Sequence, residues 1–309
     1  MKTIFFPDQT LNDGMFAATI GFFDGVHEGH RFLMKRLKDE AAQRGLRSMV
    51  ITFERHPRQV VHSDWQPELL TTLDEKMALI DETGIDTLVV LRFDREMAAL
   101  SAHDFMQVLK EQLGVRCLLT GYDNRFGHDR TEGFEDYRRY GQALDIKVLC
   151  GDALAVGQQN VSSSRTRHLL KEGKVEEATR CLGRPYSMSG IVVHGEQIGR
   201  SIGFPTANLQ PDACKLIPLD GVYAVMADIG GEASKQGITN IGTRPTFDGT
   251  SRTLETNLLD EVGDLYGRRI TLHFIGRLRN EQHFPSVEAL AAQIQKDKEQ
   301  ATDILNDYE

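Results

Sequence analysis

The sequence predicts an α/β plus β chain in two domains. Residues 1–184 are expected to form a Rossmann-like domain with a parallel sheet, because apolar strand-like runs alternate there with amphipathic helical runs. Residues 185–309 are expected to form an antiparallel barrel or sandwich, because short strands follow one another between Gly- and Pro-bearing turns. The length of 309 residues also exceeds what one hydrophobic core usually organises.

The periodicity of the first domain predicts five strands with helices between them. The expected strands are residues 17–22, 48–53, 87–93, 115–120 and 146–150, and the helical stripes are centred on residues 32–41, 77–80 and 105–109. Ligands of such sheets bind beyond the carboxyl ends of the strands, where loops and helix N-termini converge. A binding site is therefore expected at that edge of the sheet.

The second domain is predicted to hold five short strands and a closing helix. The expected strands are residues 188–194, 222–228, 237–241, 253–259 and 269–275. Apolar residues from Val287 to Leu305 recur at helical spacing and predict a terminal helix that packs against the barrel. Between the domains, a polar helical run ends at Gly183 and Pro185, which places the expected boundary there.

Composition and charge narrow the class of protein. The formal net charge of −9 argues against a general nucleic-acid binder, which needs excess positive charge facing phosphates. A small anionic ligand remains compatible with this charge. The four cysteines show no metal-binding spacing, and no stretch has the length of a signal-peptide core or a membrane span. We therefore expect a cytoplasmic protein without membrane contact.

The strongest local motif is G-F-F-D-G-V-H-E-G-H at residues 21–30. It follows the first expected strand and opens the first long helix, whose free amides and dipole suit a phosphate. Gly21, Gly25 and Gly29 let the backbone approach a ligand closely. His27 and His30 lie three residues apart and are expected to face one pocket.

Two further segments of the first domain are ambiguous by themselves. V-S-S-S-R-T-R at residues 161–167 reads either as a plain serine N-cap or as hydroxyls and an arginine gathered at a helix start. G-Y-D-N-R-F-G at residues 121–127 follows the fourth expected strand and reads either as a Gly-rich turn or as part of a ligand site.

In the second domain, the segment at residues 194–208 ends in G-F-P-T-A-N. Thr206 and Asn208 lie two residues apart, so on an extended segment they share one face and their oxygens suit a hydrated Mg²⁺. A β-turn with incidental polar residues fits the same spacing. Glu255 alternates with Leu254 and Thr256, which by itself indicates only an outward strand carboxylate.

Taken together, these segments resemble the bacterial bifunctional riboflavin kinase/FAD synthetase family. H-E-G-H at 27–30 looks like the H-x-G-H signature of nucleotidyltransferases, and G-R-S-I-G-F-P-T-A-N at 199–208 looks like that of riboflavin kinases. Companion motifs follow in the family's order at residues 221–225, 240–247, 254–260, 264–267 and 278–284. The resemblance implies an N-terminal nucleotidyltransferase domain and a C-terminal riboflavin kinase barrel.

For the first domain, the resemblance implies FMN adenylylation with ATP, giving FAD and pyrophosphate. His27 and His30 would stabilise charge on the α-phosphate. The implied ATP and phosphate contacts are Gly21, Phe23, Asp24, Gly25, Gly29, Ser163, Ser164 and Arg167, and the implied flavin contacts are Asp123 and Phe126. Asn124 stands where the family pattern has Phe, and Ser164 where Thr is more usual.

For the second domain, the resemblance implies ATP-dependent phosphorylation of riboflavin to FMN. Glu255 would be the catalytic base, while Thr206 and Asn208 would hold Mg²⁺ on ATP. The implied ATP and flavin contacts are Gly199, Arg200, Gly203, Pro205, Asn240 and Arg279. Asn257 replaces the customary His of this family, and His283 replaces a customary Lys.

Two rival interpretations remain. One is a riboflavin kinase whose first domain no longer accepts FMN or adenylylates another phosphate. The other is a flavin- or nucleotide-binding module without turnover, although binding alone needs no base such as Glu255. The expected partners are ATP, riboflavin and FMN, and the sequence does not indicate an oligomeric state.

Overall fold

The computed structural model describes residues 1–308 except for residues 10, 12–13, 62–67, 122–124, 129–130, 153, 157–158, 196–198, 200–202, 231–232, 247–248 and 261–262. The chain divides into two compact units, Met1–Ser163 and Ser164–Glu309. The expected boundary lies 21 residues later, so helices α7 (Ser163–Lys171) and α8 (Val175–Leu182) group with the second unit. The division of the two activities at residue 184 stays a prediction.

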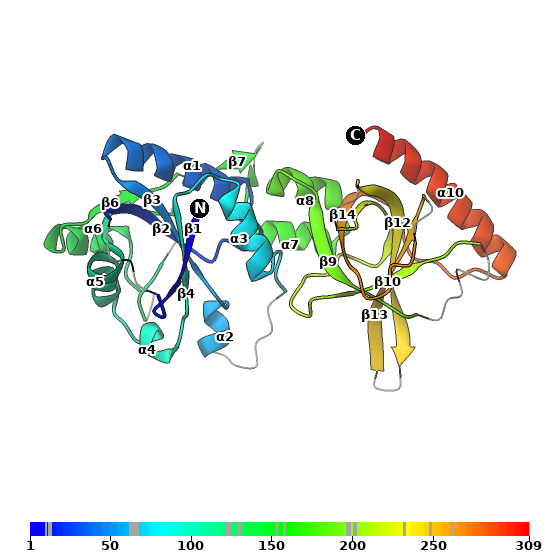
Figure 1. Ribbon diagram of the computed structural model, residues 1–309, viewed down its shortest axis with the longest axis horizontal. Coiled ribbons are helices and arrows are strands. Elements are labelled where there is room, and N and C mark those ends of the chain that lie inside the picture. The colour runs from blue at the N-terminus through cyan, green and yellow to red at the C-terminus, as the bar shows by residue number, and fades with distance from the viewer. Residues whose placement is uncertain are drawn as a thin grey trace. The chain divides into compact units, whose positions relative to one another are not determined.

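The first unit contains a parallel sheet of six strands in the order β1-β4-β3-β2-β5-β6 (Figure 1). The strands are β1 (Lys2–Phe6), β2 (Phe16–Ile20), β3 (Arg47–Phe53), β4 (Thr87–Leu91), β5 (Val115–Thr120) and β6 (Lys147–Cys150). The five expected strands are confirmed, and β1 is an additional edge strand that pairs with β4. The two short strands β7 (Ala155–Val156) and β8 (Gln159–Asn160) pair antiparallel with each other.

Helices cover both faces of this sheet because its strands are apolar on both sides. On β2, Phe16 and Ala18 belong to a core cluster with α5 (Ala102–Leu113) and α6 (Phe134–Ala143). Ala17, on the opposite face, belongs to a cluster with α1 (Glu28–Gln43) and α3 (Leu73–Asp81). The remaining helical segments are η1 (Asp24–Val26), α2 (Pro57–Val61) and α4 (Arg95–Ala98). The sandwich of helices around a parallel sheet confirms the predicted Rossmann-like class.

The second unit is a closed antiparallel barrel of six strands in the order β10-β13-β12-β11-β14-β9. The strands are β9 (Tyr186–Val193), β10 (Ala207–Pro211), β11 (Gly221–Asp228), β12 (Lys235–Thr246), β13 (Gly249–Leu258) and β14 (Arg269–Arg279). Along β13, Leu254 and Thr256 are buried, and the Thr256 hydroxyl lies 2.9 Å from that of Thr239. Glu255 between them is half-buried, so it points to the other side of the wall.

The terminal helix α10 (Val287–Asn306) is confirmed, and it packs on β11, β12 and β14 of the barrel (Figure 1). Ser286 caps its start by accepting a hydrogen bond from the amide of Ala289. Ala301 and Leu305 are fully buried against the barrel residues Ala224 and Ile238. The helix therefore forms one side of any cavity that lies between it and these three strands.

Two absences that bear on function hold for the described part of the chain. None of its helices combines the length and the apolar composition that crossing a bilayer requires. No disulfide joins its cysteines, of which Cys117 and Cys181 are buried and Cys150 is exposed.

Candidate active sites

The loop after β2 adopts an unusual backbone conformation. Phe23, Gly25 and Val26 have φ values of 53°, 80° and 39°, all in the left-handed region. Only glycine adopts this region without steric cost, and each of the other two costs on the order of 1–3 kcal/mol. Such strain persists only where surrounding contacts fix the backbone, and it is concentrated at functional sites.

Asp24 supplies those contacts. Its side chain is buried, and its carboxylate accepts hydrogen bonds from the amides of Leu70 and Thr71 and from the Thr71 hydroxyl, at 3.0 to 3.1 Å. The Thr71 hydroxyl in turn accepts from the amide of Gly25 at 3.0 Å. Asp24 therefore holds the loop against the segment that precedes α3, and its expected contact with ATP stays a prediction.

His27 and His30 are brought together as predicted. The His27 ring caps α1, where its Nδ1 accepts a hydrogen bond from the His30 amide at 3.3 Å. The two rings stack with centroids 3.5 Å apart, and the edge of Phe23 contacts His30. Burial lowers the pKa of His30 well below its usual value, and the charges of His27 and Lys76 lower it further. His30 is therefore neutral near pH 7, and its Nδ1 is buried with no partner among the described residues.

The serine segment meets the same loop. The Ser163 hydroxyl donates a hydrogen bond to the carbonyl oxygen of Asp24 at 2.9 Å, across 139 positions of sequence. Gly21 and Gly29 flank the loop, and the nearest backbone atom to a Cβ built on Gly29 is the carbonyl oxygen of Val161. Ser164 and Arg167 lie on α7 in the second unit, and their part in the site stays a prediction.

The described residues include one of the two expected flavin contacts, Phe126. Asp123 and its neighbour Asn124 lie outside the described residues. The Phe126 ring stacks on Tyr137 at 4.0 Å, and the Phe126 amide donates to the Tyr137 hydroxyl at 3.0 Å. One face of Phe126 is therefore covered by protein, which leaves its flavin contact a prediction.

Lys76 is a charged residue of this region that the motifs did not indicate. It is only 2% exposed, and its Nζ donates to the carbonyl oxygens of Phe22 (3.2 Å) and Phe53 (3.0 Å). Burial lowers its pKa from the usual 10.5 to about 8, against the opposing charge of Asp24. The signal that could have identified it is spacing. Lys76 lies three residues after Leu73 and four before Ile80, on the apolar stripe of α3.

In the barrel, three polar side chains form a row across neighbouring strands. The register pairs Asn240 of β12 with Glu255 of β13, and Glu255 with Asn208 of β10. Directly opposed residues of antiparallel strands share one face, so all three point to the same side of the wall. Thr206 precedes β10 by one residue and lies two positions before Asn208, at the end of this row.

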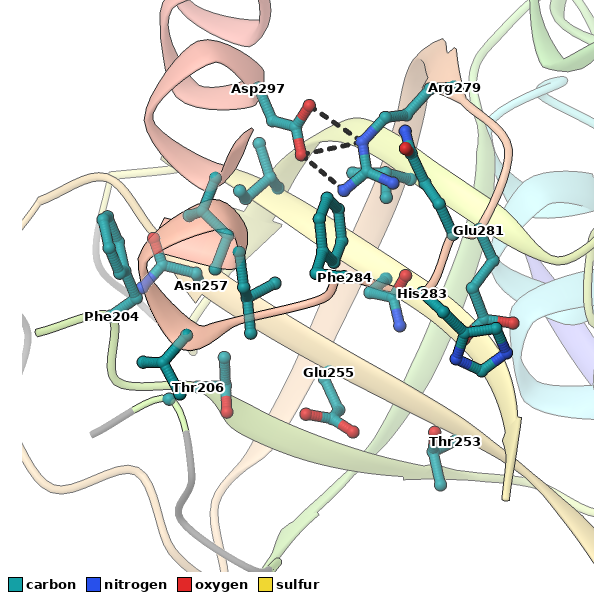
Figure 2. A pocket seen from close by; sticks show the side chains of 18 of the residues that line it. Phe204, Thr206, Thr253, Glu255, Asn257, Arg279, Glu281, His283, Phe284 and Asp297 are labelled. Atoms are coloured by element: carbon teal, nitrogen blue, oxygen red, sulfur yellow. Dashed lines mark hydrogen bonds and ion pairs between the residues drawn. The ribbon is translucent and has the colours of Figure 1, made fainter. Parts of the chain in front are cut away.

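Two cavities meet beside this row. The first, of about 540 Å³, lies between the barrel wall and α10 and is lined by Asn240 and Glu255 among others. The second, of about 890 Å³, contains Tyr266. Thr206 and Asn257 line both cavities, so the two spaces adjoin there. Figure 2 shows Glu255 and Thr206 in the lower part of the view and Arg279 and Asp297 in the upper part.

An ion pair also lines the first cavity. The Arg279 guanidinium donates to both carboxylate oxygens of Asp297 on α10, at 2.7 to 3.0 Å (Figure 2). Its charge also lies 5.6 Å from the centre of the Phe284 ring. Arg279 was expected to contact ATP or flavin. Its Nε and Nη2 hold α10 through Asp297 and its Nη1 donates to the carbonyl oxygen of Asn280, so the ligand contact stays a prediction.

Among the described residues, only one of the two polar side-chain atoms of Asn257 has a hydrogen-bond partner. Its Nδ2 donates to the carbonyl oxygen of Pro205 at 2.7 Å, which fixes the backbone just before Thr206. Its Oδ1 is buried and has no partner among the described residues. An acceptor in this position suits a donor of a bound ligand.

The glycine-rich segment before β10 is described in part. Gly199 lines the first cavity and accepts a hydrogen bond from the amide of Phe204, and a Cβ on Gly199 would lie 2.3 Å from the Phe204 carbonyl oxygen. Only glycine therefore fits at position 199. Gly203 and Pro205 line the second cavity, and Arg200 lies outside the described residues.

The donors for a metal ion differ from those of a transition-metal site. No group of three or more His, Cys, Asp or Glu that could hold a metal occurs in the described part of the chain. Thr206 and Asn208 offer oxygens beside the Glu255 carboxylate, and oxygen donors with several retained waters suit Mg²⁺. The residues present therefore fit Mg²⁺ that is also bound to ATP phosphates.

Comparison with known proteins relates the two parts of the chain to two families. Residues 10–165 match the family model described as FAD synthetase, and residues 182–305 match that described as riboflavin kinase. Bifunctional riboflavin kinase/FMN adenylyltransferase from Escherichia coli K12 is 41% identical over 281 residues, which cover 91% of this chain and 90% of the relative. The Bacillus subtilis protein of the same description is 36% identical over 288 residues, with the same two coverages.

A solved structure extends the likeness to the whole fold. The crystal structure of a Streptococcus pneumoniae protein described as a macrolide-efflux protein is 29% identical and superposes with a TM-score of 0.88, covering 97% of this chain and 98% of that one. The family matches together span both compact units. The chain therefore belongs to the bifunctional riboflavin kinase/FMN adenylyltransferase family and carries both the activity that makes FMN and the activity that makes FAD.

Proposed function

We propose that the two activities occupy two separate sites, with FMN adenylylation at the loop of residues 21–30 and riboflavin phosphorylation at the barrel wall around Glu255. The observation that carries the second assignment is the meeting of two cavities at Thr206 and Asn257, next to Glu255. A phosphoryl transfer needs two substrates that touch at one point, and two adjoining cavities supply such a point.

In the kinase site, riboflavin occupies the first cavity and ATP the second. The flavin ring would lie among the apolar lining residues Phe204, Phe284, Val222, Ile238, Leu290 and Ile294. Glu255 orients the ribityl 5′-hydroxyl and accepts its proton, while the hydroxyl oxygen bonds to the γ-phosphorus and the bond to the β-phosphate oxygen of ATP breaks.

Thr206 and Asn208 would hold Mg²⁺ on the ATP phosphates, where the ion neutralises phosphate charge. Asn257 supports the segment that carries Thr206, because its Nδ2 donates to the carbonyl oxygen of Pro205. Its Oδ1 accepts a hydrogen bond from the ligand. Asn240 lies on the other side of Glu255 in the same row and restricts where the hydroxyl can bind.

In the adenylyltransferase site, the FMN phosphate attacks the α-phosphorus of ATP and pyrophosphate leaves. The FMN phosphate is already ionised near neutral pH, so the site needs no general base. Neutral His30, His27 and the amides at the start of α1 stabilise the charge that develops on the α-phosphate. Ser163, whose hydroxyl contacts this loop, would bind the departing pyrophosphate.

The test separates the two reactions in one full-length chain. With riboflavin, ATP and Mg²⁺, chromatography of the flavins should show FMN and then FAD. Glu255→Gln should abolish the use of riboflavin and leave conversion of FMN to FAD intact. Glu281→Gln is the matched control, because it removes another carboxylate of the same cavity that has no assigned chemistry.

His30→Ala tests the other site. It should stop the pathway at FMN while riboflavin phosphorylation continues at its original rate. If Glu255→Gln and His30→Ala damaged both steps equally, the assignment to two sites would be wrong. If Glu255→Gln left the phosphorylation of riboflavin intact, the role given to this carboxylate would be wrong.

A further inference from the structure

The proposed chemistry does not use the buried ammonium group of Lys76. This group lies beside the loop of residues 21–30, to which FMN adenylylation is assigned above, and it donates a hydrogen bond to the carbonyl oxygen of Phe22 in that loop. It also hydrogen-bonds the carbonyl oxygen of Phe53, the last residue of the neighbouring strand β3. One side chain therefore connects two chain segments at the carboxyl edge of the sheet, which is where ligands of this fold class bind.

The surroundings of Lys76 do not neutralise it as a structural ion pair would. No carboxylate lies within ion-pair distance of its Nζ among the described residues, and its hydrogen-bond partners are uncharged carbonyls. The Nζ also lies 4.2 Å from the centre of the Phe22 ring. A buried lysine without a paired anion disfavours folding, so the fold retains at this place a charge that it does not need for its own stability.

We propose that Lys76 is a positioning residue of the adenylyltransferase site, which fixes the loop of residues 21–30 against the end of β3 and places a buried positive charge beside the neutral His30. This inference rests on the assignment of FMN adenylylation to that loop. The charge contributes an electrostatic field that favours a triphosphate, whereas the hydrogen bond to Phe22 holds the backbone just before Phe23 and the strained turn.

The position of Lys76 is itself fixed by the helix that carries it. Thr72 and Glu75 form a reciprocal capping box at the start of α3. Thr71, the residue before Thr72, donates hydrogen bonds from its amide and its hydroxyl to Asp24 in the loop of residues 21–30. Lys76 therefore extends from a helix whose start is hydrogen-bonded, through Thr71, to the same loop of residues 21–30 that its ammonium group contacts.

The titration of Lys76 provides a readout that a purely structural role would not give. The titratable groups that face its ammonium are Asp24 and His30, and His56 contacts the Phe22 ring on which the ammonium lies. Because burial lowers the pKa of Lys76 to about 8, the charge is lost just above neutral pH. An arginine at this position would stay charged throughout this range.

The experiment compares Lys76→Met and Lys76→Arg in the full-length chain, with riboflavin kinase activity of the same molecules as the internal control. Lys76→Met should lower kcat/KM for ATP in FMN adenylylation by about 100-fold or more, which is the size of effect that loss of one preorganised donor produces. Lys76→Arg should retain activity within about tenfold. Kinase activity should change less than about twofold in both variants.

The matched control is Lys38→Met, because Lys38 is another lysine of the first unit that donates to a backbone carbonyl, that of Thr83. It should leave both activities unchanged. In the wild-type protein, kcat/KM for ATP should fall above pH 8, and in Lys76→Arg this fall should move to higher pH, because kcat/KM reports the ionisation of the free enzyme.

The outcomes separate this inference from the function on which it rests. If Lys76→Met adenylylates FMN within threefold of wild type, Lys76 is not a positioning residue. If Lys76→Met does not fold, the pH profile of Lys76→Arg decides, and a fall that stays at pH 8 overturns the inference. If His30→Ala also leaves adenylylation intact, the site assignment itself is wrong.

Discussion

Replacing Lys76 by Met should make the stability of the first unit less dependent on pH. Lysine in an unfolded chain has a pKa near 10.5, and burial lowers that of folded Lys76 to about 8. The unfolded chain therefore binds the proton more tightly between these values. Protonated Lys76 disfavours folding fully below pH 8, and this penalty disappears as the pH rises through 10.5.

The size of the effect follows from the difference in pKa. At 1.36 kcal/mol for each pKa unit, the penalty is about 3 kcal/mol at pH 7 and below about 1 kcal/mol at pH 10. Methionine has a similar length and no charge, so Lys76→Met does not carry this penalty. The difference in unfolding free energy between variant and wild type should therefore shift by about 2 kcal/mol between pH 7 and pH 10, in favour of the wild type.

The measurement must report on the first unit alone, because a chain with two compact units need not unfold in one step. Urea titrations read by hydrogen exchange of peptides from β4 and β5 meet this condition, and peptides from β11 follow the second unit. The charge of Lys76 lowers the pKa of His30, but His30 is already neutral from pH 7 upward, and groups distant from Lys76 contribute equally to both proteins and cancel in the difference. A difference that stays constant from pH 7 to pH 10 would refute the buried, charge-penalised state of Lys76.

Three other changes test packing described above. Asp297→Asn leaves the Arg279 guanidinium without its carboxylate partner and should lower the unfolding free energy of the barrel by about 3 kcal/mol, measured by urea titration at pH 7. Tyr137→Phe removes the acceptor of the Phe126 amide and should cost the first unit about 1–3 kcal/mol in the same titration. Gly25→Ala places a Cβ at a φ of 80° and should cost about 1 kcal/mol or more, with FMN adenylylation reduced in the flavin assay and riboflavin phosphorylation unchanged.

The sequence indicated the strands that carry a strong local pattern and missed those that depend on distant partners. β1 is a short segment whose pairing with β4 spans about 85 positions, and nothing within residues 2–6 specifies that partner. The local pattern around residues 207–211 does not predict the strand β10, which forms because β9 and β13 both pair with it. Such pairings are settled by the whole fold and not by local propensity.

The same reasoning explains which site residues were missed. The histidine pair was predictable because its spacing and its glycines lie within ten residues. Lys76 and Asp297 each occupy an inward position on an amphipathic helix, where an apolar residue is usual. A charged residue on an apolar stripe was the available signal for both. Their partners lie on strands distant in sequence, Phe53 on β3 for Lys76 and Arg279 on β14 for Asp297, so the sequence alone did not identify them.

The wall that carries Glu255 is a strand, and this restricts how the kinase can change in evolution. Even steps along β13 keep a residue on the cavity side, and odd steps move it into the interior of the barrel. Loss of one residue between Gly249 and Glu255 would turn the carboxylate to the interior position that buried Leu254 now occupies and would place Thr256 where Glu255 was. We therefore expect length changes in this part of the chain to be tolerated in pairs, or confined to the turns.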